Sequence, residues 1–287
     1  LPDAELYKPY VLDGTTFYAG DASWQWTVTS DNPCDAVFLT TTTKGPTYDL
    51  AGGVTSTITL TPRLTGDYTL HAMVTPTSGP AFQCDMVVHA GLPGLRVEQC
   101  SDKSSTADLD LHLHRPGTTT NWETTPDDCY YMNCKADAVA IANWGYANSP
   151  IAACQDSPTG TQWQTVGSCR NPRLEVDSIM NDGVPEIAVV DTPIDSATYR
   201  VAVRYYQGTV TAHPIVTINC GGKRAAAYGV APDQVTGFNQ SGPTGQIWRV
   251  ADVTTTVTNG VTDCTVTPLH PPGQISGYWV QSNSLAY

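Results

Sequence analysis

Basic residues are scarce in this chain, and charged residues of either sign are few. The 287 residues include 14 Lys and Arg against 27 Asp and Glu, which gives a net charge of −13. Because phosphates repel so acidic a chain, we expect no binding to nucleic acid or to anionic membranes, and cations are the better-matched partners. No apolar run approaches the roughly 18 residues of a transmembrane helix, so we expect no membrane insertion.

The motifs of common enzyme classes are missing as well. The sequence contains no Gly-x-Ser-x-Gly, no His-Glu-x-x-His and no Gly-rich phosphate loop. Paired carboxylates can act as acid and base in glycoside cleavage at separations of about 5 to 9 Å, but metal ligation explains the acidic residues of this chain more simply. We therefore predict a non-enzymatic protein.

Helical periodicity is absent, and nearly every periodic segment alternates like a β-strand. These segments are rich in Val, Thr, Tyr and Trp and are bounded by Gly, Pro, Asn or Asp. The expected strands cover residues 24–30, 55–62, 68–76, 82–90, 95–100, 108–115, 199–207, 215–220, 248–257, 264–269 and 278–281. Many short strands separated by turn signals predict an all-β protein built from β-sandwiches.

A break rich in Gly and Pro at residues 90–94 divides this pattern into two domains in tandem. The predicted domains are residues 1–92 and 95–287, and the short connection should restrict their relative orientation. The second domain includes a long stretch with few periodic segments, residues 116–172. A loop of this length is normally functional or is held by crosslinks and ions, and here we expect disulfides to staple it.

Nine cysteines without the paired spacing of a zinc site indicate an oxidising compartment. We therefore expect a secreted or cell-surface protein whose leader has been removed. Pairing cannot be deduced uniquely, but position along the chain favours Cys34 with Cys84, Cys129 with Cys134, Cys154 with Cys169, and Cys220 with Cys264. Cys100 is left over, either as a buried free thiol, which we favour, or as an intermolecular link.

Residues 108–114 alternate strictly, with three leucines on one face of the predicted strand and charged or imidazole side chains on the other. Asp108 and Asp110 then lie about 7 Å apart on the same face. They repel each other unless water, protons or a shared cation compensates, so the alternatives are a solvated sheet face and a calcium site. His112 and His114 leave a zinc site open as a third alternative, which we do not favour.

Four short segments of the first domain carry a family resemblance. They are Leu-Asp-Gly-Thr at 12–15, Ser-Trp-Gln-Trp-Thr-Val at 23–28, Gly-Asp-Tyr-Thr-Leu at 66–70 and Cys-Asp-Met-Val-Val at 84–88. In these segments the domain resembles PKD-type, immunoglobulin-like domains of extracellular proteins. The resemblance implies a spacer or interaction module without chemistry of its own.

The second domain carries five ordered motifs. They are Gly-Leu-Arg-Val-Glu at 94–98, Asp-Leu-Asp-Leu-His at 108–112, Asp-Cys-Tyr-Tyr at 128–131, an acidic segment ending in Pro-Glu at 174–186, and a Tyr-rich strand at 198–206. In these motifs the domain resembles a large, mostly uncharacterised family of secreted bacterial β-sandwich domains, frequent in deltaproteobacterial surface proteins.

The acidic residues of these segments form the predicted metal site. Calcium takes about six to eight oxygen ligands and tolerates the irregular geometry of loops between strands. We expect one or two calcium ions, held by Asp110, Asp128, Asp177 and Asp182, with Asp108, Glu175 or Glu186 completing the shell. Ser178 and Val184 stand where the family carries an acid and a glycine, which leaves one of the sites open to being degenerate.

The favoured function is a structural or adhesive component of the cell surface, such as a self-assembling subunit of a filament or matrix. Thr-rich strands, few charges and many crosslinks suit a durable extracellular polymer. The leading segment, residues 1–12, could add as a strand to the sheet edge of a neighbouring molecule. The simpler alternative is that it pairs within its own domain.

The second-ranked function is calcium-dependent carbohydrate binding. Sugar binding needs exposed aromatic side chains beside polar groups. The candidate platform consists of Trp122, Tyr130, Tyr131, Trp144 and Tyr146, which could equally form a small core beneath the long loop. A third alternative is an accessory region of a larger secreted enzyme.

Overall fold

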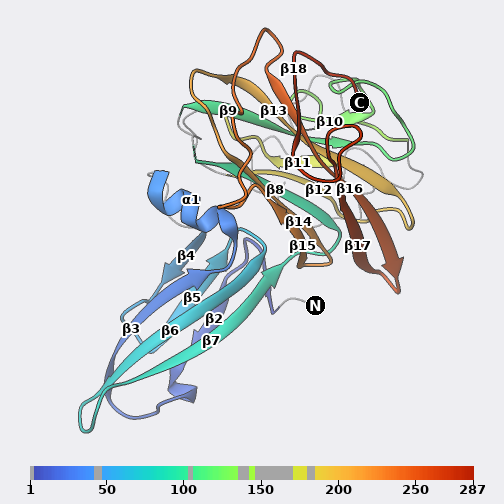
Figure 1. Ribbon diagram of the computed structural model, residues 1–287. Coiled ribbons are helices and arrows are strands. Elements are labelled where there is room, and N and C mark those ends of the chain that lie inside the picture. Colours follow the sequence, from blue (N-terminus) through green and yellow to red (C-terminus); the bar gives the residue numbers. More distant parts are fainter. Residues whose placement is uncertain (1–2, 42–46, 103–105, 135–141, 146–170, 180–184) are drawn as a thin grey trace.

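Two pairs of β-sheets make up the computed structural model, which describes residues 3–41, 47–102, 106–134, 142–145, 171–179 and 185–287 (Figure 1). The protein is all-β, as the sequence predicts, and the described part contains a single α-helix. No helix in the described part is long and apolar enough to cross a membrane.

The first domain has a four-stranded and a three-stranded sheet. The larger sheet has the order β1 (Ala4–Glu5), β7 (Phe82–Gly91), β6 (Gly66–Pro76), β3 (Ala22–Ser30), and the smaller has the order β2 (Tyr10–Asp13), β5 (Thr57–Pro62), β4 (Tyr48–Ala51). Alternate residues of β6 are buried, as the period-two pattern requires. The Tyr68 hydroxyl donates to the Leu64 carbonyl at 2.8 Å, which is the geometry of a tyrosine corner.

The leading segment pairs within its own domain. Residues 4–5 run parallel to β7, and residues 10–13 pair antiparallel with β5.

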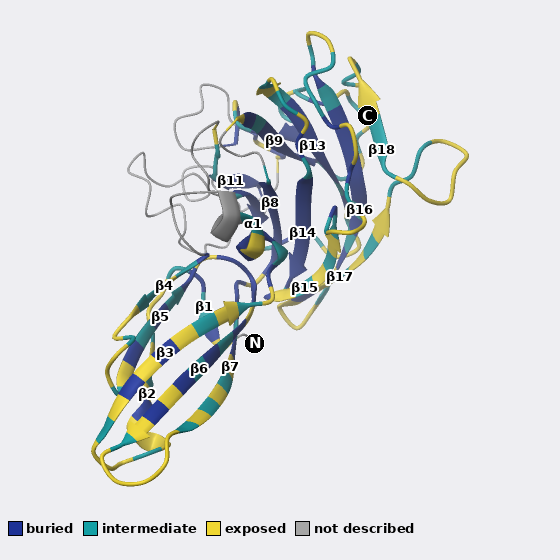
Figure 2. Ribbon diagram, turned by 60° about the vertical axis from the view of Figure 1, so that its left-hand side comes forward, coloured by how far each residue is buried: buried dark blue, intermediate teal, exposed yellow. Residues whose placement is uncertain are grey.

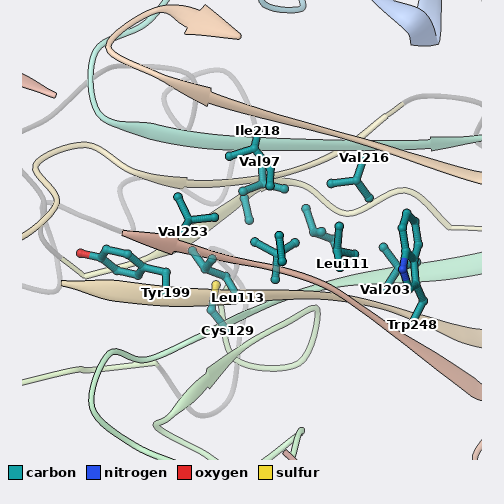
Figure 3. Packing of buried hydrophobic residues seen from close by; sticks show 14 of the residues in the cluster. Val97, Leu111, Leu113, Cys129, Tyr199, Val203, Val216, Ile218, Trp248 and Val253 are labelled. Carbon is teal, nitrogen blue, oxygen red and sulfur yellow. The ribbon is translucent and has the colours of Figure 1, made fainter. Parts of the chain in front are cut away.

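The second domain stacks two larger sheets. One has the order β10 (Asp128–Cys129), β9 (Ala107–His114), β13 (Thr198–Gly208), β16 (Gln246–Thr258), β17 (Val261–Pro268), with β18 (Trp279–Ser282) also paired to β16. The other has the order β11 (Arg173–Val176), β12 (Glu186–Val190), β8 (Leu95–Ser101), β14 (Pro214–Cys220), β15 (Lys223–Tyr228). The leucines of β9 face the core between these sheets, as predicted, where Leu111 and Leu113 pack near Val97 and Trp248 (Figure 3).

All eleven strands expected from the sequence are present within about two to three residues at each end, the usual uncertainty of strand boundaries. The expectation that the chain has no helix is wrong, because α1 (Pro33–Thr41) follows β3, and a single 3₁₀ turn (Gly14–Thr16) follows β2. The Asn32 side chain caps α1 by accepting from the Cys34 amide at 2.9 Å, and Pro33 occupies the first helical position. These local signals outweigh the missing amphipathic stripe.

Two of the predicted disulfides, Cys129–Cys134 and Cys220–Cys264, are confirmed. The prediction for Cys34 is wrong, since it is bonded to Cys100, and among the described cysteines Cys84 is the free thiol. The reason is α1, which contacts β8 and so carries Cys34 out of its own sandwich, whereas Cys84 lies within β7 opposite Ala72 of β6. The fourth predicted pair, between positions 154 and 169, falls outside the described residues.

Candidate functional site

The two domains meet over the outer face of the sheet that contains β8. Both β8 and β14 are buried along their whole length (Figure 2). A small apolar cluster joins Cys34 and Leu64 of the first domain to Cys100, Ile187, Val189 and Ile215 of the second. The disulfide runs through this cluster, so a covalent bond and apolar packing hold the domains at the same place.

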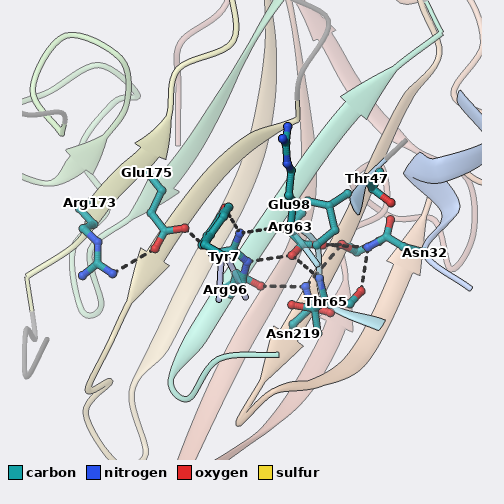
Figure 4. Close-up of polar contacts among 12 residues, drawn as sticks. Tyr7, Asn32, Thr47, Arg63, Thr65, Arg96, Glu98, Arg173, Glu175 and Asn219 are labelled. Carbon is teal, nitrogen blue, oxygen red and sulfur yellow. Dashed lines mark hydrogen bonds and ion pairs between the residues drawn. The ribbon is translucent and has the colours of Figure 1, made fainter. Parts of the chain in front are cut away.

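Glu98 of β8 is the polar centre of this junction (Figure 4). Its side chain is fully buried and accepts four hydrogen bonds. From the first domain, the Asn32 side-chain amide and the Thr65 backbone amide donate at 3.0 and 2.9 Å. From the second, Arg96 Nε and the Thr217 hydroxyl donate at 2.8 and 3.1 Å. Donors from both domains therefore satisfy the one buried carboxylate of Glu98.

Arg96 extends the junction into a buried ion network. Its guanidinium pairs with Glu98 and Glu175 and donates to the Tyr7 hydroxyl of the first domain at 2.8 Å. Arg173 in turn pairs with Glu175 and Asp191. Burial alone would lower the pKa of Arg96, but the carboxylates of Glu175 and Glu98 outweigh it and hold this pKa above its ordinary value. Buried pairs of this kind add little net stability but fix geometry.

Glu175, predicted as a calcium ligand, therefore lies in this network between two arginines. Arg96 and Glu98 are functional residues to which no sequence motif assigns a role. The available signal was an Arg-x-Glu pair inside a short strand at a domain boundary, where charged side chains are rarely buried without partners.

A close backbone contact adds to the junction. Gly91, at the end of β7, lies so near Gly222 that an added Cβ would stand 2.4 Å from the Gly222 carbonyl oxygen. His89 Nε2 lies 2.7 Å from the same oxygen. The Arg224 side chain reaches Asp31, donating to its backbone carbonyl at 2.9 Å and pairing with its carboxylate.

A second feature, which we name the carboxylate cluster, consists of Asp108, Asp110, Asp177 and Glu186. Asp110 and Glu186 are buried, with 3% and 0% of their surface exposed. One oxygen of Asp110 and both oxygens of Glu186 have no donor in regular hydrogen-bond geometry, although the Leu111 backbone amide approaches Glu186. Unsatisfied buried carboxylate oxygens are costly and rare in native structures.

Burial and mutual repulsion raise the pKa values of Asp108, Asp110 and Glu186. Burial raises the pKa of Asp110 to about 7, with Asp108 and Asp177 adding to the rise while His112 and Arg204 oppose it. Burial and Asp177 raise the pKa of Asp108 to about 6. The pKa of Glu186 lies well above its ordinary value because of burial and the nearby carboxylates of Asp110 and Asp177. These four side chains thus act on one another electrostatically.

The other predicted calcium ligands lie elsewhere. Asp128 is fully buried, but its carboxylate lies 2.7 Å from His112 Nδ1 and accepts from the Glu123 amide at 2.6 Å. Asp182 falls outside the described residues. Within the described ranges, no three His, Cys, Asp or Glu side chains already stand close enough together to hold a metal ion. The carboxylate cluster is therefore not a preformed ligand shell.

The predicted aromatic platform is wrong for most of its members. Trp122, Tyr130 and Trp144 are buried. His112 stacks on Tyr130 with ring centroids 5.4 Å apart and meets the edge of Trp122 at 5.7 Å. Trp144 belongs to the main core of the second domain, and Trp122 packs with Ala202 and Ile247, so the alternative of a separate small core is only partly met. Tyr131 is only partly exposed, and position 146 is outside the described residues.

The second imidazole of β9 is also engaged by the loop. His114 Nε2 lies 3.0 Å from the Thr120 carbonyl oxygen, and its Nδ1 lies 3.3 Å from that of Arg115. The two histidines thus pack the loop onto the outer face of β9 and present no shared zinc geometry.

A shallow cavity of about 170 Å³ lies beside β16 and the chain that follows β17. Its lining includes Tyr228, Asp233, His270 and Tyr278. The Tyr278 hydroxyl is held by the Asp233 carbonyl at 2.7 Å, and His270 Nδ1 lies 2.8 Å from the Gly277 carbonyl. The sequence gives no signal for this cavity, because its residues come from three strands and the turns that follow them and share no motif.

Comparison of the chain with protein-family models, curated proteins and solved structures gave no significant match to any of them.

Proposed function

We propose that the protein is a secreted, non-enzymatic structural or adhesive module in which two β-sandwiches act as one rigid body, stabilised by disulfides and calcium. The observation that carries this proposal is the domain junction, where the Cys34–Cys100 disulfide lies beside the buried Glu98. Most interfaces between domains of one chain are modest and polar, and relative motion is the default. A covalent bond and a shared buried charge remove that freedom, which suits a spacer or load-bearing subunit.

Several features support an extracellular setting and assembly. Three disulfides in the described part of the chain fit an oxidising compartment. Among the described strands, β2 pairs only with β5, so its other edge is open to a strand from a neighbouring molecule. Val11, in the middle of β2, has 63% of its surface exposed. Assembly would therefore use the free edge of β2 while residues 4–5 stay paired with β7.

Electron microscopy of the native surface material, with antibody labelling of this chain, tests the proposed role. Labelled fibres or a regular matrix are the expected result. Labelled particles that are dispersed and monomeric at all concentrations would contradict assembly.

Carbohydrate binding is the second candidate, and one observation favours it. The cavity between Tyr228 and Tyr278 offers two aromatic rings beside the imidazole of His270, which is a common composition for a sugar subsite. A glycan array decides between the two functions. A purely structural subunit should bind no glycan specifically, whereas a sugar-binding protein should bind one with micromolar affinity and lose that binding in Y228A.

A further inference from the structure

We propose that the carboxylate cluster binds a calcium ion, with Asp110 and Glu186 as its central ligands and Asp108 and Asp177 completing its acidic side. The proposal rests on the calcium part of the proposed function, and it is independent of the structural role. It differs from the ligand set expected from the sequence, since Asp128 and Glu175 are excluded.

Buried carboxylate oxygens of Glu186 and Asp110 lack regular hydrogen-bond partners. Glu186 is fully buried, and both of its oxygens lack a regular hydrogen bond, although the Leu111 backbone amide approaches the carboxylate closely enough to oppose the rise in its pKa. One oxygen of Asp110, in β9, likewise lacks a hydrogen-bond partner. An ionised carboxylate in such a position costs several kcal/mol unless a positive charge or several donors compensate it. Two such side chains in one cluster indicate a shared counter-charge.

Within the described part of the chain, the basic side chains near the cluster are already engaged elsewhere. Arg204 lies opposite Asp110 in the sheet, but its Nε donates to the Thr244 carbonyl at 2.9 Å and its Nη1 pairs with Glu123. Arg96 and Arg173 are engaged by Glu175. His112 binds the Asp128 carboxylate through Nδ1. The counter-charge must therefore come from outside the described residues, or the carboxyls must hold protons.

The donor set favours calcium over other cations. All four side chains of the cluster offer carboxylate oxygens, which hard cations prefer, whereas zinc prefers nitrogen and sulfur ligands. The ligands come from β9, from the residue after β11 and from the first residue of β12. Ligands from three separate elements rarely form a strict octahedron. Calcium tolerates irregular coordination, whereas magnesium requires near-ideal octahedral geometry.

Calcium would draw these elements together. Asp108 and Asp110 belong to one sheet of the second domain, and Glu186 belongs to the other. Asp177 and Glu186 also bracket the connection from β11 to β12. A bound ion would therefore crosslink the two sheets at one edge of the sandwich, at a place where the structure otherwise gathers like charges.

Calcium titration of the chelator-treated full chain, followed by calorimetry and by thermal melting, tests the site. The wild type should bind calcium with a rise in Tm, and magnesium should bind at least about tenfold more weakly. E186Q and D110N should each weaken calcium binding at least about tenfold. D49N, which removes an exposed carboxylate of the first domain, is the control and should bind as the wild type does.

A second readout keeps the test decisive if a variant is poorly behaved. Without calcium, E186Q should melt at the same temperature as the wild type or higher, because the amide, unlike the carboxyl group, never carries a buried charge beside Asp110. With calcium, the order should reverse. Absence of calcium binding by the wild type overturns the calcium proposal altogether. Binding that E186Q and D110N leave unchanged overturns the ligand assignment alone, and neither result bears on the rigidity of the domain pair.

Discussion

Cys34 of α1, the helix that follows β3, is disulfide-bonded to Cys100 of β8, with Cα atoms 5.9 Å apart. The bond joins two β-sandwiches that each have their own core. Glu98 lies two residues from Cys100 and accepts hydrogen bonds from both domains. A crosslink and a buried charge thus act on the same short strand, which makes the domain junction the best-defined feature of the molecule.

Removing this crosslink should destabilise the whole chain. The disulfide closes a loop with a sequence separation of 66, and bonds of that span typically contribute about 3 to 4 kcal/mol. We expect C34A/C100A to lose about that much free energy of unfolding in denaturant titrations. C84A removes the free, half-buried thiol and is the matched control, expected to lose less than about 1.5 kcal/mol. Equal losses in both variants would show that the disulfide has no special role.

Glu98 should be sensitive even to an isosteric change. E98Q removes the charge opposite Arg96 and replaces one acceptor oxygen with a donor, although four donors point at the carboxylate. Breaking a buried pair in this way costs about 3 to 5 kcal/mol. The exposed pair between Asp49 and Arg63 provides the comparison, and D49N should cost less than about 1 kcal/mol. Thermal unfolding of the two variants measures the difference, and similar Tm values would count against a buried network.

Gly91 should tolerate no side chain. An added Cβ would lie 2.6 Å from Gly222 Cα as well as 2.4 Å from its carbonyl oxygen, and backbone cannot rotate away as a side chain can. We expect G91A to cost about 1 to 3 kcal/mol. G53A is the control, because the nearest atom to its new Cβ would be 3.8 Å away and its φ is not in the left-handed region. If both substitutions are equally mild, the domains do not approach as closely as described.

Stability without calcium should fall as the pH rises through the weakly acidic range. The pKa values of Asp108 and Asp110 are raised from 3.8 to about 6 and about 7. Between about pH 4 and 7 the folded state therefore holds more protons than the unfolded state, so rising pH favours unfolding. Asp13, Asp85 and Asp195 have lowered pKa values and titrate below this window.

Tm measured from pH 4 to pH 8 checks this dependence. The chelator-treated wild type should lose Tm across the window, D110N should lose less, and calcium should reduce the loss in the wild type. A Tm that rises with pH in the absence of calcium would contradict the raised pKa values of the cluster.

The strands were predictable, because alternation is a local property of the sequence and each sandwich buries one face of every sheet. Leu109, Leu111 and Leu113 face the core for this reason. β12 was missed because all five of its residues are buried, which leaves no alternation to detect. α1 was missed because its signals, Asn32 as cap and Pro33 after it, are short and lack an apolar stripe.

The sites were less predictable than the strands, because long-range pairing decides them. Cys34 was assigned to Cys84 on the assumption that a disulfide stays within its sandwich, and α1 overrides that assumption. Spacing placed Glu175 and Asp177 together, but the register of β11 against β12 shifts between Leu174 and Val176, and the two side chains have different neighbours. Glu175 then meets two arginines from other strands, which no local pattern reveals.

The distance between the two domains in solution tests the rigid-body account most directly. Val54 in the first domain and Ile275 in the second have 78% and 93% of their surface exposed, so spin labels carried there on non-canonical amino acids leave all cysteines untouched. The account predicts one narrow distance distribution for the oxidised protein, which broadens in C34A/C100A combined with E98Q. A broad or multi-peaked distribution in the oxidised wild type would contradict it.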